Sequence, residues 1–164
     1  MEGSARITLS RGAVLTLSLL AAACLTWPAN AEPLELLADT AETLGIAPGT
    51  PLAMQTVFTR KPQTVERPDL DIVRVDVGNV ARNRWLFAIH TAAPYGFGNS
   101  GLILYLDADS DPGTGRTDMG CEFMFAHSAG APGLTAFAPD GSSGTGRPPR
   151  LAIVDGVLLM CVDA

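Results

Sequence analysis

Apolar residues are distributed differently in the two parts of the chain. From about Leu70 onward, short runs rich in Val, Ile, Leu and Phe recur between clusters of Gly, Pro, Asn and Asp, which is typical of short β-strands joined by turns. The expected strands are DIVRVDV, RWLFAIHT, GLILYLD, CEFMFAH, LTAFA, RLAIV and VLLMCV. This pattern predicts an all-β domain over residues 69–164, an antiparallel β-sandwich of jelly-roll-like form.

The first of these strands alternates strictly. Val73, Val75 and Val77 stand on one face, and Arg74 and Asp76 stand on the other, so the pattern predicts one buried face and one wet face. RWLFAIHT and GLILYLD are instead apolar on both faces, which indicates central strands covered on both sides.

A hairpin is predicted near the end of the chain. Asp155 and Gly156 separate RLAIV from VLLMCV by two residues, and a type I′ turn needs positive φ at both positions. An apolar strand with no closing turn then ends the sequence, so we expect the chain to be a C-terminally truncated fragment of a longer protein.

Residues 32–68 are predicted to form an N-terminal segment and linker. EPLELLADTAETLG is typical of a short amphipathic helix. A connector follows that prolines interrupt repeatedly. The fold therefore begins with a short, partly helical segment.

Residues 1–31 have the order of a signal peptide. A basic region with Arg6 and Arg11 precedes the apolar run GAVLTLSLLAAACLTW, and Ala29 to Ala31 offers the small residues of a cleavage site. The run is shorter than the roughly 20 apolar residues of a membrane span. A second processing route is lipidation at Cys24, because LAAAC resembles a bacterial lipobox, and only this route would attach the chain to a membrane. We expect an extracytoplasmic protein, secreted or periplasmic, with a lipoprotein as the alternative.

Charge excludes one class of partner. The net charge is −6, and removal of residues 1–31, with two arginines and one glutamate, makes it −7. No basic run interleaves with aromatic residues, so we expect no nucleic acid. Cys121 and Cys161 remain after cleavage; an oxidising compartment permits a disulfide between them, and burial as small apolar side chains explains them equally well.

The acidic stretch DADSDPGTGRTD begins where GLILYLD ends. Asp107, Asp109 and Asp111 alternate, so they project to one side of an extended backbone, where like charges repel unless a cation is present. Calcium takes about 6–8 oxygen ligands from such loops. The hypothesis is a calcium site formed by these three residues with Asp118 and Glu122.

Two observations limit this hypothesis. Asp118 falls at the last position of an EF-hand-like loop, but Pro112 stands where that motif has Gly, and the flanks are strands rather than helices. Asp111, Pro112 and Gly113 also suit an ordinary turn. A solvated acidic turn without a bound ion therefore remains an alternative to the calcium site.

The same residues resemble a known family. An apolar strand ending in D-x-D at Asp107 and Asp109, a loop closing in Thr114-Gly115, and a following strand that opens with G-x-E-F are similar to carbohydrate-binding-module-like β-sandwich domains of bacterial secreted proteins, the DOMON-like and family 9 type. DLDIVRVDVGN is similar to their first strand, and the resemblance covers residues 69–125. It implies an accessory module, often calcium-stabilised, that binds polysaccharide or adjoins a catalytic domain.

The aromatic residues depart from this family. Sugar-binding members stack their ligand on paired tryptophans, whereas the chain after residue 31 has only Trp85, in a strand where a core position is expected. Tyr95 and Phe97 on a glycine-rich loop are the candidate ligand-binding residues. The same two aromatics equally suit a cover over the end of the sandwich.

No catalytic residues are assigned. His90 and His127 stand in no recognisable nucleophile or zinc motif, and a strand histidine such as His90 is typical of hydrogen-bonded structure. The predicted function is a secreted, non-catalytic accessory or binding module, calcium-stabilised and carbohydrate-binding by resemblance. The alternative is part of an extracytoplasmic hydrolase whose catalytic residues lie outside this sequence.

Overall fold

The chain divides into two compact units. The first unit combines Met1–Leu25 with Asn99–Pro148, and the second combines Thr26–Gly98 with Pro149–Ala164. The computed structural model describes residues 13–18, 33–96, 102–107, 111, 113–116, 118, 120–128, 131–137 and 142–163. The second unit thus contains the whole predicted N-terminal segment, residues 32–68, and strands on both sides of residues 99–148 in sequence.

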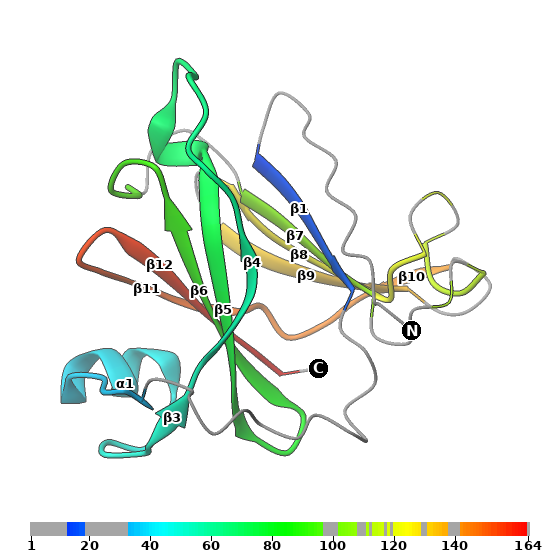
Figure 1. Ribbon diagram of the computed structural model, residues 1–164. Coiled ribbons are helices and arrows are strands. Elements are labelled where there is room, and N and C mark those ends of the chain that lie inside the picture. The colour runs from blue at the N-terminus through cyan, green and yellow to red at the C-terminus, as the bar shows by residue number, and fades with distance from the viewer. Residues whose placement is uncertain are drawn as a thin grey trace. The chain divides into compact units, whose positions relative to one another are not determined.

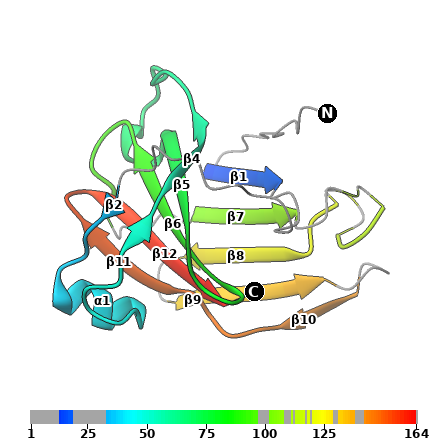
Figure 2. The ribbon, with the colours of Figure 1, turned by 60° about the horizontal axis from the view of Figure 1, so that its bottom comes forward.

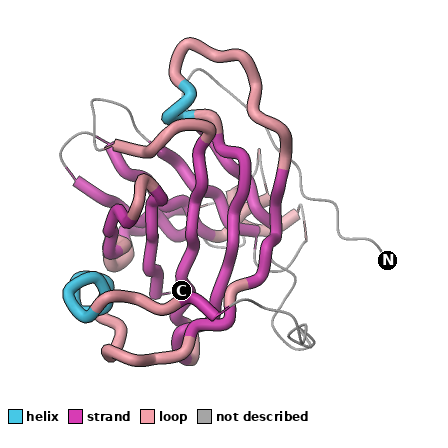
Figure 3. The backbone as a smooth tube through the Cα atoms, turned by 60° about the vertical axis from the view of Figure 1, so that its left-hand side comes forward, coloured by secondary structure: helices cyan, strands magenta, loops and turns pink. Residues whose placement is uncertain are grey.

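An antiparallel sheet with the order β11-β12-β6-β5-β4 forms the second unit (Figures 1 and 3). Its strands are β4 (Gln55–Thr59), β5 (Ile72–Ala81), β6 (Arg84–Thr91), β11 (Arg150–Val154) and β12 (Val157–Asp163). The strands predicted from DIVRVDV, RWLFAIHT, RLAIV and VLLMCV are confirmed. The predicted hairpin is confirmed as well, because Asp155 and Gly156 join β11 to β12 with φ of 50° and 78°.

The central strand β6 is covered on both sides, as its composition predicts. Leu86, Phe87, Ala88 and Ile89 are consecutive along the strand, so they alternate between the two faces, and all four are buried. On one of these faces a core cluster links the sheet to the N-terminal segment. Its buried members are Ala41, Leu44, Ile46, Leu52, Leu86, Ala88, Leu159 and Cys161.

The N-terminal segment contains more regular structure than a linker. Helix α1 (Ala38–Leu44) is present where a helix is predicted, and β2 (Pro33–Leu34) pairs with β3 (Leu52–Ala53). β3 and β4 both lie in the proline-rich stretch that the sequence analysis treats as a connector. Of the leucines in EPLELLADTAETLG, only Leu44 is helical, and it is fully buried.

Helix α1 ends at Gly45, and the carbonyl of this glycine binds a side chain of the sheet. Gly45 has φ of 67°; its N–H donates to Glu42 O at 2.9 Å, and Ile46 N–H donates to Ala41 O at 2.8 Å, which is a Schellman motif. Arg84 of β6 donates to Gly45 O at 3.1 Å, so a positive charge lies at the carbonyl end of the helix, where the macrodipole favours it.

The start of β5 is fixed by a buried ion pair. The short 3-10 helix η1 (Pro68–Leu70) leads into the strand. Directly after it, Asp71 is 4% exposed, pairs with Arg60, and accepts a hydrogen bond from Gln63 N at 2.7 Å. The loop between β4 and β5 is therefore fastened at its base.

The first unit contains a sheet with the order β1-β7-β8-β9-β10 (Figure 2). Its strands are β1 (Ala13–Ser18), β7 (Leu102–Asp107), β8 (Phe123–Ser128), β9 (Ala131–Phe137) and β10 (Ser143–Thr145). The three strands predicted from GLILYLD, CEFMFAH and LTAFA are confirmed, and together the sheets confirm the all-β class. The sandwich arrangement stays a prediction.

One strand of this sheet lies in the predicted signal peptide. β1 pairs with β7 in parallel, from Ala13 opposite Leu102 to Ser18 opposite Asp107, whereas the other neighbours are antiparallel. Cleavage of the signal peptide is not tested by this pairing. A chain processed after residue 31 would lack β1, and β7 would then form an edge of the sheet.

Candidate ligand-binding site

The register of the second unit's sheet places polar residues of three strands side by side. Thr56 of β4 is opposite Asp76 of β5, which is opposite Ala88 of β6. One row further, Arg74 of β5 is opposite His90 of β6. Because directly opposed residues project to the same face, a polar group forms on the face that also carries Ala88.

A β-bulge brings a second threonine to this face. Thr56 and Thr59 of β4 are three positions apart, so a regular strand would direct them to opposite faces. The register shifts between Thr56 and Phe58, and Thr59 is opposite Arg74. The extra residue of the bulge re-aims the strand, and both threonines line the same cavity.

Asp76 is the centre of the polar group. Its side chain is 5% exposed. Oδ1 accepts hydrogen bonds from Thr56 Oγ1 at 2.6 Å and Arg74 Nε at 2.8 Å, and Oδ2 accepts one from His90 Nε2 at 2.9 Å. A buried carboxylate is costly unless it is paired and hydrogen-bonded, and three side chains meet that requirement here.

The protonation of Asp76 follows from these contacts. Burial acts to raise its pKa, but hydrogen bonds from Arg74, Thr56 and His90 and the charge of Arg74 outweigh it, so the pKa lies below the usual 3.8. The ionised carboxylate only accepts hydrogen bonds. Nε2 of His90 therefore carries a hydrogen, and Nδ1 is the second polar atom of the ring.

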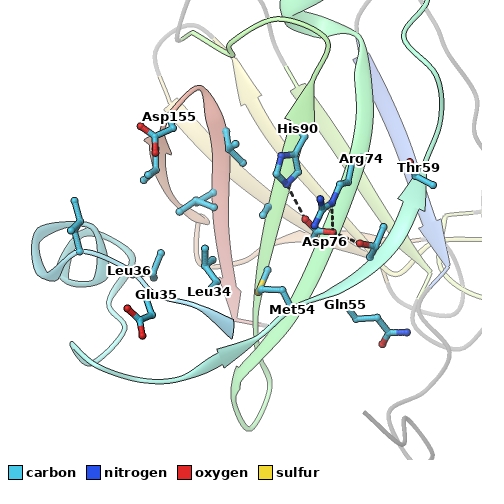
Figure 4. A pocket seen from close by; sticks show the side chains of 16 residues that line it. Leu34, Glu35, Leu36, Met54, Gln55, Thr59, Arg74, Asp76, His90 and Asp155 are labelled. Atoms are coloured by element: carbon cyan, nitrogen blue, oxygen red, sulfur yellow. Dashed lines mark hydrogen bonds and ion pairs between the residues drawn. The ribbon is translucent and has the colours of Figure 1, made fainter. Parts of the chain in front are cut away.

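A cavity of about 930 Å³ opens over this face. Its floor is the sheet, and one wall is the N-terminal strap, residues 34–37, which runs from β2 to α1. Figure 4 shows Arg74, Asp76 and His90 close together on one part of the floor, with Met54 between them and the strap residues Leu34 and Leu36. The residues that line the cavity are Leu34, Glu35, Leu36, Leu37, Met54, Gln55, Thr56, Thr59, Arg74, Asp76, Ala88, His90, Val154, Asp155, Val157 and Leu159.

The apolar part of the cavity is aliphatic. Leu34, Leu36, Met54, Val154 and Val157 are partly buried and pack against the core cluster, while Leu37 of the strap is 76% exposed. None of the lining residues that the structure describes is Phe, Tyr or Trp. Two carboxylates, those of Glu35 and Asp155, stand exposed on the strap and on the β11–β12 turn.

The expectation of a wet face on β5 is correct for Arg74, which is exposed, and wrong for Asp76. Asp76 is 3% exposed as a residue and lies in the floor of the cavity rather than in open solvent. The alternation of valines shows which face is apolar, but the cover over the other face comes from residues far away in sequence. One usable signal was present: His90 interrupts an otherwise apolar strand, and its prediction as hydrogen-bonded structure agrees with its bond to Asp76.

Three of the predicted calcium ligands, Asp111, Asp118 and Glu122, have partners close by in sequence. Asp118 pairs with Arg116, with oxygen to nitrogen distances of 2.6 and 2.9 Å. Asp111 Oδ1 accepts from Gly113 N at 2.8 Å, and Glu122 Oε1 accepts from Thr114 Oγ1 at 3.0 Å. Local hydrogen bonds of this kind form in an acidic turn with or without a bound cation, so they do not decide between the two alternatives.

The calcium hypothesis itself stays a prediction. Asp107 is buried at the end of β7, and Asp109 lies outside the described residues. Within the described part of the chain, no three His, Cys, Asp or Glu side chains gather as a metal site.

The other candidate residues are distributed as follows. Tyr95 is 3% exposed, and burial first and the charge of Asp69 second raise its pKa; Phe97 lies outside the described residues. Tyr95 does not line the cavity.

Cys121 and Cys161 are buried free thiols, and burial raises the pKa of Cys121 to about 11. Both thiols are therefore unreactive in this state.

Comparison with protein-family models, curated proteins and solved structures finds no match to this chain. Among the helices that the structure describes, none has the length and apolar character of a membrane span. Any function must therefore be argued from the geometry of the site.

Proposed function

We propose that this chain is an exported, non-catalytic binding module whose ligand site is the cavity over β5 and β6. The observation that carries the proposal is the ionised, buried Asp76 on the floor of a large, mostly aliphatic cavity, with Arg74 and His90 bound to it. A concave apolar surface with a few convergent polar groups is the usual form of a small-molecule site. Export is proposed because residues 1–31 have the order of a signal peptide.

The size of the cavity supports this proposal. Ligand cavities in proteins have volumes of roughly 300–1,000 Å³, and the volume here is about 930 Å³. Without a ligand of this size, the apolar side chains that line the cavity would face water. The sheet below the cavity is antiparallel, and the core cluster packs against the same face.

Binding is favoured over hydrolysis by the hydroxyl groups of the site. A serine or threonine nucleophile needs a base that accepts its proton. Here Thr56 donates to the carboxylate of Asp76 at 2.6 Å, and this carboxylate is already ionised and engaged by Arg74 and His90. The pKa of Asp76 lies below its usual 3.8, so this carboxylate is a weak base, and Thr56 supports Asp76 rather than being activated by it.

Carbohydrate binding and calcium are separate parts of the prediction. The sequence predicts sugar recognition by Tyr95 and Phe97, and calcium binding by acidic residues between positions 107 and 122. Neither set supplies a described residue of this cavity. The proposed ligand of the cavity is therefore a small apolar molecule with a polar group, and calcium is retained as a stabilising ion to be tested independently.

The test is the binding of a neutral, environment-sensitive dye, N-phenylnaphthylamine, to the purified full chain. Ala88→Phe places an aromatic ring on the floor of the cavity, so we expect dye affinity to fall about tenfold or more. Val157→Phe, at a less buried position, should have the same direction of effect. Ala47→Phe, at an exposed site outside the cavity, is the matched control.

Thermal unfolding of each variant accompanies the titration. Unchanged dye affinity in folded Ala88→Phe and Val157→Phe would refute the cavity as the binding site. Loss of dye binding in Ala47→Phe as well would show that the dye binds elsewhere or nonspecifically.

A further inference from the structure

The apolar stripe of α1 continues one residue beyond the start of the helix. Ala41 and Leu44 are the buried residues of α1. Leu37 precedes them by four and seven positions, which is the spacing of a single helix face. Leu37 is nevertheless 76% exposed, and it is not helical, because its φ of −59° and ψ of 147° belong to an extended backbone. A residue with the spacing of the buried face is therefore left in solvent.

The buried face of α1 packs into the same cluster as the floor of the cavity. Ala41 and Leu44 share the core cluster with Ala88 and Leu159, and the last two also line the cavity. Leu37 is itself a lining residue. If α1 began one residue earlier, the side chain of Leu37 would join this face and turn from solvent toward the floor.

The strap is held at both ends and has few hydrogen bonds between them. Leu34 pairs with the fully buried Leu52, and α1 is anchored by its buried face. Within the described part of the chain, residues 35–36 form no hydrogen bond, and the carbonyl of Leu37 accepts one from Ala41 N at 2.9 Å. The side chain of Leu37 gives the first turn no capping bond, so no cap fixes the residue at which the helix begins.

Turning Leu37 inward gains contacts only when something lies beneath it. An apolar side chain over a void lacks partner atoms on one side, whereas a ligand in the cavity supplies them and so favours the inward arrangement. We infer that the strap is a lid: when a ligand fills the cavity, α1 extends through Leu37, and this side chain closes over the ligand. The inference rests on the proposed function, because it describes how the same cavity closes.

The first test measures the affinity of the full chain for N-phenylnaphthylamine after the lid side chain is shortened. We expect Leu37→Ala to weaken dye binding about tenfold, because the buried apolar contact is lost. The melting temperature without dye should change little, since Leu37 is exposed there. Val65→Ala, at the other large apolar side chain that is exposed among the described residues, lies outside the cavity and is the matched control.

A proline variant distinguishes closure from a fixed contact. Ala38 is the first residue of α1, a position that suits proline, and the residue before a proline is kept out of the helical conformation. Ala38→Pro therefore keeps the extended Leu37 and every lining side chain but blocks extension of the helix. We expect the same loss as in Leu37→Ala, about tenfold, with an unchanged or higher melting temperature. Ala38→Ser is the matched control.

Amide exchange measured by NMR reports the closure itself. In the structure, the first bond of α1 runs from Ala41 N to Leu37 O. Extension of the helix by one residue gives the N–H of Thr40 an acceptor, the carbonyl of Leu36. We expect the Thr40 amide to exchange about tenfold more slowly in the dye complex, and to be unaffected by dye in Ala38→Pro.

The outcomes separate the lid from the proposed function. Loss of affinity in Leu37→Ala without loss in Ala38→Pro would overturn the lid, because Leu37 would then contact the ligand from its extended position. Unchanged affinity in both variants, or equal losses in Val65→Ala or Ala38→Ser, would overturn it as well. In these cases exclusion of the dye by Ala88→Phe would leave the cavity as a site. Dye binding that is indifferent to Ala88→Phe and Val157→Phe would overturn the proposed function.

Discussion

Carboxylates are used in opposite ways in the two units. In the first unit, the acidic segment of residues 107–122 has several of them, and two bind partners close by in sequence: Asp111 binds Gly113, and Asp118 binds Arg116. In the second unit, the single Asp76 receives side chains from three adjacent strands. Convergence in space, more than local density of acid, identifies the better candidate site.

The largest expected difference between the two regions is in stability. Asp76→Ala would leave Thr56, Arg74 and His90 without their acceptor, and removing one partner of a buried, charged network costs about 3 kcal/mol of unfolding free energy. Asp111→Ala removes an exposed turn residue and should cost less than about 1 kcal/mol. Urea unfolding of both variants measures the difference, and equal losses would contradict the contrast drawn here.

Acid should weaken the second unit through the same residue. The pKa of Asp76 is lower in the folded chain than its usual 3.8, so the unfolded chain binds the proton more readily. The contribution of Asp76 is therefore complete above the unfolded pKa and is lost as pH falls through the folded pKa. The loss of stability in acid should be smaller than the loss in Asp76→Ala, because a protonated carboxyl still fills its space.

The comparison for this effect is Asp76→Asn, which cannot titrate at that position. Urea unfolding between about pH 3 and pH 6 should show a steeper loss in the wild type than in the variant. Asp69, whose pKa is lowered by Arg67, contributes to both proteins and cancels in the difference. Parallel curves for the two proteins would mean that Asp76 is not held ionised by its neighbours.

The smallest of these effects concerns calcium and the acidic segment. If Asp109 and its neighbours bind calcium, an ion at about ten times its dissociation constant adds about 1.4 kcal/mol to the unfolding free energy. The melting temperature should then rise with calcium and not with magnesium, and Asp109→Ala should abolish the rise. Asp39→Ala, on α1, is the matched control, and no rise in the folded wild type would identify a solvated turn.

The strands that sequence predicts best are those with strong apolar runs. RWLFAIHT and VLLMCV become β6 and β12, and the Asp155-Gly156 turn has the positive φ angles expected of it. β4 was not predicted, because QTVFT is short and contains a bulge, and it pairs only along one edge. β10, with the sequence SGT, has no apolar residue to mark it.

The candidate site was predicted only in fragments. The sequence indicates hydrogen-bonded structure for His90 and places Arg74 and Asp76 on one face, but nothing in the local pattern joins them to Thr56 or to the strap. The bulge at Val57 decides that Thr56 and Thr59 share a face. The cover over Asp76 depends on the pairing of β2 with β3 and on the docking of α1.

The sequence by itself determined the class of structure, because alternation of apolar residues and the geometry of turns act over a few neighbouring positions. It also determined where carboxylates are dense. Only the tertiary structure decided which carboxylate is buried and held by other side chains, since that depends on strand register and on which segment covers which face. Asp76 and Arg74 follow the alternation of a wet strand, and three strands and a strap make them the floor of a cavity.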